Sequence, residues 1–197
     1  MPDLTDVMSF FEEVRSSYIR ALEHAIRVAL EKNPGARVLQ EVVAKTEDSS
    51  YKTCWDLAIE KSDGNLEPVL VDLHRFLPWE AARIRMGNLS VDVEPFLWHV
   101  CTLVARPALA QLDLTPLAHW FDRWFERPQE PGERFRNAVH WMSDPEIKHG
   151  HLFLQIDRGT AHTDALVDLL NTLGALGATS AALYTSPDYA TTDPDIA

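Results

Sequence analysis

Two histidines separated by one residue, His149 and His151, stand at the start of the apolar segment "HLFLQID". Alternate residues of an extended chain share a face, so both imidazoles can point the same way. Two such imidazoles can bind Zn²⁺ or another transition metal, although a catalytic site usually needs a third protein ligand. The candidates for that third ligand are His140, Asp144, Asp157 and His162.

The same two histidines also have a purely structural interpretation. Lys148 and Gly150 beside them are typical of a turn that leaves a hairpin, and turns are polar for ordinary reasons. The chain contains no HExxH and no CxxC motif that would support a metal centre. The turn is therefore the favoured interpretation, and no metal ligand is assigned.

A second polar group, His119, Asp122 and Glu126, recurs at steps of three and four residues. On a helix these side chains share one face, where a carboxylate can orient an imidazole that acts as a general base. The alternative is a solvated stripe opposite the neighbouring tryptophans. Because the chain also lacks GxSxG, GxGxxG and P-loop motifs, the sequence assigns no catalytic residue and no cofactor.

The charge balance indicates which partners to expect. Thirty acidic residues against 18 basic ones give a net charge of −12 over 197 residues. This excess argues against nucleic acid, which needs a cationic surface, and it favours a basic protein partner. The sequence shows no secretory signal and no apolar run of the ~18 residues that a membrane span requires. We therefore expect a cytoplasmic protein that does not bind membranes, with Cys54 and Cys101 as buried free thiols.

Apolar periodicity predicts the elements at both ends of the chain. Residues 7–30 repeat at three- and four-residue steps, which predicts a long amphipathic helix that ends at "NPG", 33–35. Residues 36–45, 51–61 and 66–76 alternate as in strands, and Asp63-Gly64 predicts a hairpin within this antiparallel meander. Residues 151–157, 162–177 and 178–186 predict a strand, a helix and a strand, with the two strands parallel.

The middle of the chain gives a less regular pattern. Pro78 and Pro95 stand where helices begin, so residues 77–88 and 94–112 are predicted as helices, with a brief strand at "LSVDV" between them. The β-branched residues of 94–112 also fit a strand. Thr115 and Pro116 start a better-defined helix over residues 114–128. Residues 134–143 fit a helix or a strand equally well. Six tryptophans are many for this length, and we expect most of them in the core.

Together these patterns predict an α+β fold. A long N-terminal helix packs on a mostly antiparallel sheet, with central helices and a C-terminal βαβ unit. Residues 1–186 form one domain with an internal linker at 128–133, and residues 187–197 form a flexible acidic tail.

Three functions compete on this basis. The preferred one is a non-enzymatic, acidic protein-binding protein, such as a bacterial toxin-neutralising immunity protein or a secretion chaperone. The alternatives are a metal-dependent hydrolase that uses His149 and His151, and a structural subunit that forms a homodimer through its first helix. A pocket in which imidazoles and carboxylates converge would argue for an enzyme.

Overall fold

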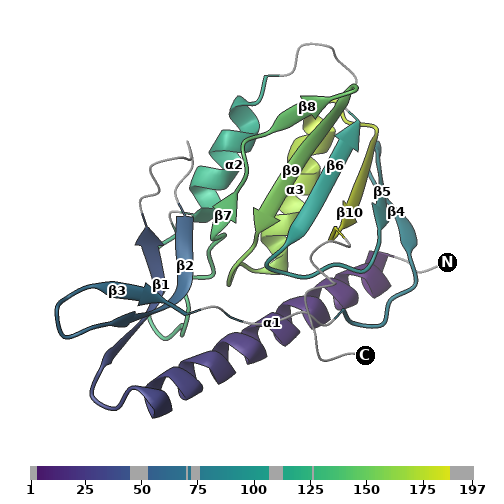
Figure 1. Ribbon diagram of the computed structural model, residues 1–197. Helices are drawn as coiled ribbons and strands as arrows, with labels where there is room; N and C mark the ends of the chain where they lie inside the picture. Colours follow the sequence, from purple (N-terminus) through teal and green to yellow (C-terminus); the bar gives the residue numbers. More distant parts are fainter. Residues whose placement is uncertain are drawn as a thin grey trace.

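The computed structural model describes residues 4–44, 53–69, 71, 76–106, 113–125 and 127–186 (Figure 1). Within them it contains three helices and two separate sheets. The helices are α1 (Leu4–Lys32), α2 (Thr115–Phe125) and α3 (Thr163–Ala175). The predicted α+β fold is confirmed, with a long N-terminal helix, a mostly antiparallel sheet and a C-terminal strand–helix–strand unit.

The smaller sheet is the predicted antiparallel meander. Its order is β1–β2–β3, and the loop between β2 and β3 contains Gly64 with a φ of 82°, which a residue without Cβ adopts at no steric cost. The third strand is much shorter than the predicted run over residues 66–76. The three strands are β1 (Arg37–Ala44), β2 (Thr53–Glu60) and β3 (Leu66–Pro68).

The larger sheet has seven strands in the order β4–β5–β10–β6–β9–β7, and β8 also pairs with β9. Every pair is antiparallel except β5 with β10. Because β9 and β10 both run antiparallel to β6, they are parallel to each other, as predicted. The strands are β4 (Ala82–Met86), β5 (Leu89–Val93), β6 (Cys101–Arg106), β7 (Trp141–Met142), β8 (Glu146–Lys148), β9 (His151–Asp157) and β10 (Ser180–Tyr184).

Two helix predictions for the middle of the chain are wrong. Residues 77–88 contain β4, which forms a hairpin with β5 around Gly87, and the described part of residues 94–112 contains β6. The physical reason is period-two burial: Ala82 and Ile84 are buried while Arg83 and Arg85 are exposed. The prolines that suggested helix starts stand instead in the loops before these strands. Among the described residues, α2 is the one predicted central helix that the structure contains.

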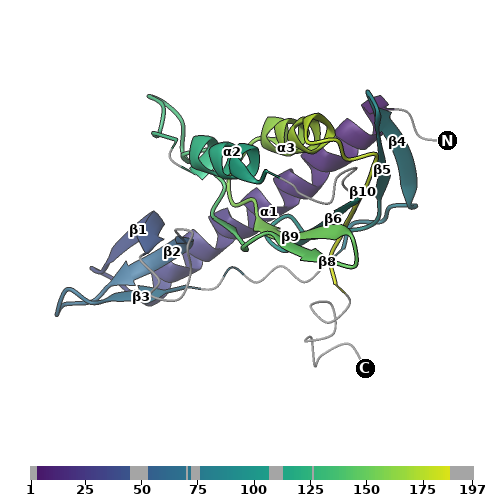
Figure 2. The ribbon, with the colours of Figure 1, turned by 90° about the horizontal axis from the view of Figure 1, so that it is seen from above.

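All three helices lie on one face of the larger sheet, and α1 continues past its edge to the smaller sheet (Figures 1 and 2). The apolar stripe of α1 is buried against both sheets, at about 1.5–3 kcal/mol for each large side chain. The predicted amphipathic helix thus buries its apolar face within its own chain. No helix in the described part of the chain is long and apolar enough to span a membrane.

The described residues cover only part of the predicted domain organisation. Residues 128–133 form turns and irregular structure between α2 and β7, where the linker is predicted. The acidic tail at 187–197 lies outside the described residues. The single domain over residues 1–186 stays a prediction.

Candidate functional site

The two sheets meet where β2 passes the start of β7. The Cys54 amide donates a hydrogen bond to the His140 carbonyl at 2.8 Å, and the His140 amide donates to the Asp157 carbonyl at 3.0 Å. The end of β9, the residue before β7 and the start of β2 are therefore held together by their backbones. Asp56 follows Cys54 along β2, so three polar side chains from distant parts of the sequence reach this junction.

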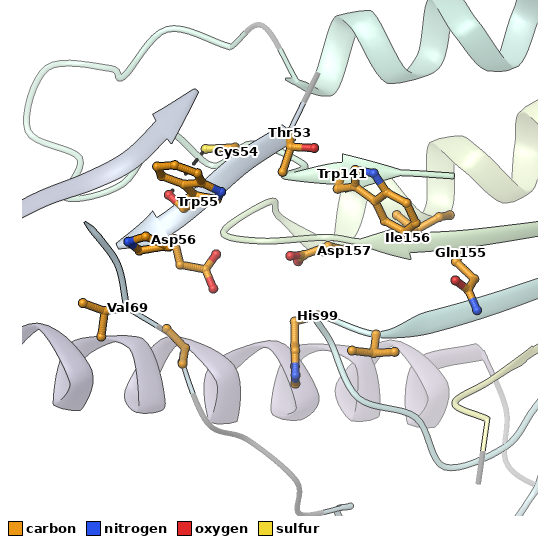
Figure 3. A pocket seen from close by; sticks show the side chains of 13 residues that line it. Thr53, Cys54, Trp55, Asp56, Val69, His99, Trp141, Gln155, Ile156 and Asp157 are labelled. Carbon is orange, nitrogen blue, oxygen red and sulfur yellow. Dashed lines mark hydrogen bonds between the residues drawn. The ribbon is translucent and has the colours of Figure 1, made fainter. Parts of the chain in front are cut away.

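A pocket of about 430 Å³ opens at this junction (Figure 3). Figure 3 shows the carboxyl groups of Asp56 and Asp157 pointing into the space between Trp55 and Trp141, with His99 below them. The remaining lining is mostly apolar: Pro68, Val69, Val71, Val100 and Ile156. Concave, largely apolar sites with a few convergent polar groups are typical of small-molecule binding sites.

Behind the pocket, the fully buried imidazole of His140 lies between two carboxylates. Its Nδ1 is 2.5 Å from Asp56 Oδ1, and its Nε2 is 3.3 Å from Glu41 Oε1. Burial alone would lower the pKa of His140, but the hydrogen bonds to Asp56 and Glu41 hold that pKa well above 6.5. His140 is therefore an imidazolium at neutral pH and donates an N–H hydrogen bond to each carboxylate.

Glu41 is the last side chain in the hydrogen-bonded series Asp56–His140–Glu41. Thr160 Oγ1 donates to Glu41 Oε1 at 2.5 Å, and the Arg136 amide donates to Oε2 at 2.6 Å. Burial raises the pKa of Glu41, but the hydrogen bonds from His140, Thr160 and Arg136 outweigh it and lower the net pKa. Glu41 has a φ of 50°, a strained conformation for a residue with a side chain, which the network maintains.

The two carboxyl groups in the pocket have opposite pKa shifts. One oxygen of Asp56 and one of Asp157 lie within 4.8 Å of each other. Burial raises the pKa of Asp157, the Asp56 charge raises it further, and the result is about 7. Burial also acts to raise the pKa of Asp56, but the hydrogen bond from His140 outweighs it and lowers the net pKa. At neutral pH, Asp56 is ionised and Asp157 is near half-protonation.

Tyr18 of α1 lies close to the carboxyl groups of Asp56 and Asp157. Burial raises the pKa of its phenol well above 10, and the charges of Asp56 and Asp157 add to this. Tyr18 lies close enough to Asp56 for this effect, although its hydroxyl makes no hydrogen bond of ordinary geometry. Its ring stacks on His99 with centroids 5.9 Å apart. Tyr18 therefore stays neutral and adds no charge to the site.

Gly159 packs directly against the face of the His140 ring. A Cβ at this position would lie 2.2 Å from His140 Cγ and Cδ2, and the residue has a φ of +49°. The Gly159 carbonyl accepts a hydrogen bond from Trp98 Nε1 at 2.9 Å, and its amide donates to Asp157 Oδ1 at 2.8 Å. The absence of a side chain here is what lets the imidazole occupy its place between the carboxylates.

We expect Gly159→Ala to reduce the free energy of unfolding more than Gly87→Ala does. Both glycines have a positive φ, at which alanine costs about 1–2 kcal/mol, but a Cβ at Gly87 meets nothing within 4 Å. The clash with His140 adds about 1–3 kcal/mol to the cost at Gly159. Urea unfolding of the two variants measures the difference. Equal losses would show that the imidazole moves aside without cost.

Ligand atoms of Asp56, His140 and Asp157 are close enough together to bind a metal ion, but the hydrogen bonds of these side chains indicate a different role. Asp56, His140 and Asp157 form the one group of this kind in the described part of the chain. Both ring nitrogens of His140 already contact carboxylates, so a metal at this ring would have to displace Asp56 or Glu41. The donor set therefore fits a buried ionic network better than a metal centre.

His149 and His151 lie elsewhere, in the hairpin between β8 and β9. Lys148 pairs with His151, and His149 and Gly150 between them have φ values of 51° and 76°. Positive φ at both central residues is the two-residue hairpin turn, so the structural interpretation is confirmed. Neither histidine belongs to a described group of three metal-ligating side chains, and a metal site there stays a prediction.

The other predicted groups do not reach the pocket. His119 and Asp122 are exposed on α2, and the Glu126 side chain lies outside the described residues. Of the third ligands proposed for His149 and His151, the structure brings His140 and Asp157 together with Asp56 instead. Trp98 and Trp120 are in the core as predicted, whereas Trp55 and Trp141 are half-buried in the pocket wall.

Sequence reasoning missed Glu41 and Asp56. Both interrupt apolar strand segments, "VLQEVV" and "TCWDLA", and they stand opposite each other between the paired residues Gln40–Leu57 and Val42–Trp55. Like charges opposite each other on neighbouring strands are destabilising unless something neutralises them. A carboxylate inside each of two pairing strands was therefore a signal for a buried cation between them.

Comparison with known proteins assigns no family. No protein-family model, no curated protein and no solved structure matches this chain. The geometry of the pocket is therefore the basis for assigning a function.

Proposed function

We propose that this protein is a hydrolase that uses the two aspartates of the pocket as an acid–base pair. The observation that carries the proposal is the pair itself. Asp56 and Asp157 approach within 4.8 Å in a mostly apolar pocket, and their surroundings push their pKa values in opposite directions. Carboxyl pairs of this kind are the means by which one site supplies both an acid and a base.

Each aspartate has a distinct role in this proposal. Asp157, with a pKa of about 7, has a proton to donate to a leaving group near neutral pH. Asp56, kept ionised by His140, acts as the nucleophile or the general base through the oxygen that His140 does not contact. His140 and Glu41 do not touch the substrate in this proposal. They position Asp56 and fix its charge.

The apolar walls of the pocket support this chemistry. Valine, isoleucine and tryptophan side chains form much of the wall around the carboxyl groups. Electrostatic interactions are stronger beside such apolar walls than in bulk solvent. The flat faces of Trp55 and Trp141 supply contact area for a ring or a planar group of the substrate.

The first test is a carboxyl-carbon NMR titration of protein labelled with ¹³Cγ-aspartate. We expect one aspartate, assigned as Asp157 by its absence in Asp157→Asn, to titrate near pH 7, while the pKa of Asp56 lies below its ordinary value of 3.8. Titration of both groups near pH 4 would contradict the proposal, because neither could then act as an acid at neutral pH.

The second test is hydrolysis of a panel of nitrophenyl esters, phosphates and glycosides. Because the acid must be protonated, we expect the rate to be level from about pH 5 to 6.5 and to fall as the pH rises through 7. The Asp122→Asn variant, changed at an exposed carboxyl on α2, is the matched control and should retain the activity. A rate that rises above pH 7, or that survives in Asp157→Asn, would exclude Asp157 as the acid.

The functions expected from composition stay predictions. Capture of a basic protein by an acidic immunity protein or chaperone depends on the net charge of −12 alone. A homodimer through α1 is likewise untested, and the apolar stripe of that helix is already buried against the two sheets.

A further inference from the structure

A second hollow adjoins the pocket along the larger sheet. It has a volume of about 540 Å³ and shares Trp141 and Gln155 with the pocket. Leu152, Leu154 and Ile156 of β9 are buried, while Phe153, Gln155 and Asp157 alternate with them and are half-buried. The helices lie on one face of this sheet (Figure 2), so the alternating residues belong to its other face. The hollow and the pocket thus lie next to each other on this face, with Trp141 and Gln155 in both linings, and together they are called the groove.

The floor of this second hollow contains a buried hydroxyl group without a partner. Thr102 of β6 is only 7% exposed, and its Oγ1 makes no hydrogen bond to any described residue. Thr102 lies opposite Gln155 in the pairing of β6 with β9. A buried polar atom without a partner costs about 1–3 kcal/mol, which a ligand that hydrogen-bonds to it would recover. This atom therefore points to a polar ligand in the hollow.

The groove is not built to take up an extended peptide as an added strand. That mode of binding needs a strand edge with unpaired backbone groups. The β9 strand, which forms the floor, pairs with β6 on one side and with β7 and β8 on the other. The groups presented to a ligand are instead side chains: hydroxyl, amide, carboxyl, ammonium and aromatic rings. The residues that present them are Thr102, Gln155, Asp144, Glu146, Lys148, Trp141 and Phe153.

We propose, on the basis of the hydrolase function above, that the substrate is an oligosaccharide whose scissile glycosidic bond lies between Asp56 and Asp157. The following sugar units lie in the second hollow. A sugar ring presents a C–H face that packs on an aromatic ring such as Trp141, and its hydroxyl groups hydrogen-bond with Thr102 and Gln155. A linear chain of such units is the ligand class that uses both hollows at once.

The spacing of the two carboxyl groups also predicts the stereochemical course. Glycosidases that retain the anomeric configuration have carboxyl groups roughly 5 Å apart, whereas inverting enzymes need about 6.5–9.5 Å to admit a water molecule. One oxygen of each aspartate lies within 4.8 Å of the other, which is closer than the spacing of inverting enzymes and therefore favours the retaining course.

The retaining reaction has two steps. In the first, Asp56 forms a bond to the anomeric carbon while the glycosidic C–O bond breaks and Asp157 gives its proton to the departing oxygen. In the second, water attacks the anomeric carbon, its proton passes to Asp157, and the bond to Asp56 breaks. One glycosidic bond and one water are thereby converted into two hydroxyl-bearing products.

The test compares short and long substrates. The short ones are nitrophenyl monoglycosides, and the long ones are β-1,4-linked and α-1,4-linked oligosaccharides of two to five units. We expect kcat/KM to rise at least tenfold from the monoglycoside to the trisaccharide of one linkage series. NMR of the first-formed product should show retained configuration.

The matched variants are Thr102→Val and Thr179→Val, because Thr179 is exposed beside β10. We expect Thr102→Val to lower kcat/KM on the trisaccharide about tenfold more than it lowers kcat/KM on the monoglycoside, whereas Thr179→Val changes neither. Valine removes the hydroxyl but keeps the shape, and no intramolecular hydrogen bond is lost. Far-UV circular dichroism and urea unfolding confirm that both variants are folded.

The outcomes separate this inference from the proposed function. Hydrolysis of esters or phosphates that depends on Asp157, with no cleavage of any glycoside, would overturn the oligosaccharide inference and leave the acid–base pair in place. Cleavage of glycosides that is independent of length, or equal in the two threonine variants, would overturn the role of the second hollow. No hydrolysis of any substrate, together with titration of Asp157 near pH 4, would overturn both.

Discussion

Replacing His140 with glutamine should lower the free energy of unfolding by about 3–5 kcal/mol at pH 7, the range expected when one partner of a buried ion pair is removed. Glutamine keeps most of the volume and can still hydrogen-bond, but it carries no charge. Glu41 and Asp56, which stand opposite each other on β1 and β2, would then repel each other without the imidazolium between them. Urea unfolding followed by tryptophan fluorescence measures the loss.

The pH range of this effect follows from the direction of each pKa shift. The raised pKa of His140 gives a contribution that is complete below pH 6.5 and is lost as the pH rises through the folded-state value. The lowered pKa values of Glu41 and Asp56 give contributions that are present above about pH 4 and are lost as the pH falls. The loss in the His140→Gln variant should therefore be largest between about pH 5 and 7.

Two further variants sharpen this experiment. His119→Gln, at an exposed histidine on α2, should change stability by less than about 0.5 kcal/mol. Adding Glu41→Gln to His140→Gln removes one of the two repelling charges and should recover part of the loss. If His140→Gln were no more harmful than His119→Gln, the imidazole would not be the cation that holds the two strands together.

Asp157→Asn should abolish activity and at the same time stabilise the protein. Removal of a general acid typically costs about 10²–10⁴-fold in rate. Asparagine retains an oxygen that can accept the Gly159 amide, so the turn after β9 keeps its hydrogen bond. It removes a carboxyl group whose ionisation is unfavourable beside Asp56 and away from water. A residue that weakens the fold but is needed for activity is the signature of a functional site.

The stability gain should depend on pH in a specific way. The pKa of Asp157 rises from an ordinary value of 3.8 to about 7 on folding. The protonated carboxyl group therefore contributes its full stability below pH 3.8, and this contribution is lost as the pH rises through 7. Asparagine does not titrate, so the variant should match the wild type near pH 4 and exceed it by about 2 kcal/mol at pH 8, after allowance for solvent screening.

The charged and titratable groups around Asp157 set the controls for this measurement. Asp56 faces it from β2, His140 from the start of β7 and Tyr18 from α1, and Arg158 follows it in the chain. The matched control is Asp122→Asn, changed at an exposed carboxyl group on α2. A difference for Asp157→Asn that does not vary with pH would mean that this carboxyl group has an ordinary pKa.

The elements at the two ends of the chain could be predicted because their burial follows one simple period. The stripe of α1 recurs at helical spacing, and the strands of the meander and of the C-terminal unit alternate. The strand β6 could not be recognised in this way. Cys101, Thr102 and Leu103 are buried in succession, because β6 is a central strand between β9 and β10. A short apolar run of this kind fits a buried helix or a buried strand equally well.

The site could not be assembled from spacing for a different reason. Glu41 and His140 are 99 residues apart, and Asp56 and His140 are 84 apart, so no local motif contains two of the interacting side chains. Asp157 and His140 each stood out as candidate third ligands for His149 and His151, but the structure places both beside Asp56. What brings them together is the order of strands in two sheets, which one sequence does not reveal.

Because one aspartate of the pair belongs to the smaller sheet and the other to the larger, the spacing between them reports how the two sheets are docked. A shift of about one ångström between the two sheets would leave every strand intact, but it would misalign the carboxyl oxygens of Asp56 and Asp157. The long helix α1 packs against both sheets. It therefore fixes the position of one sheet relative to the other, and with it the distance between the two aspartates.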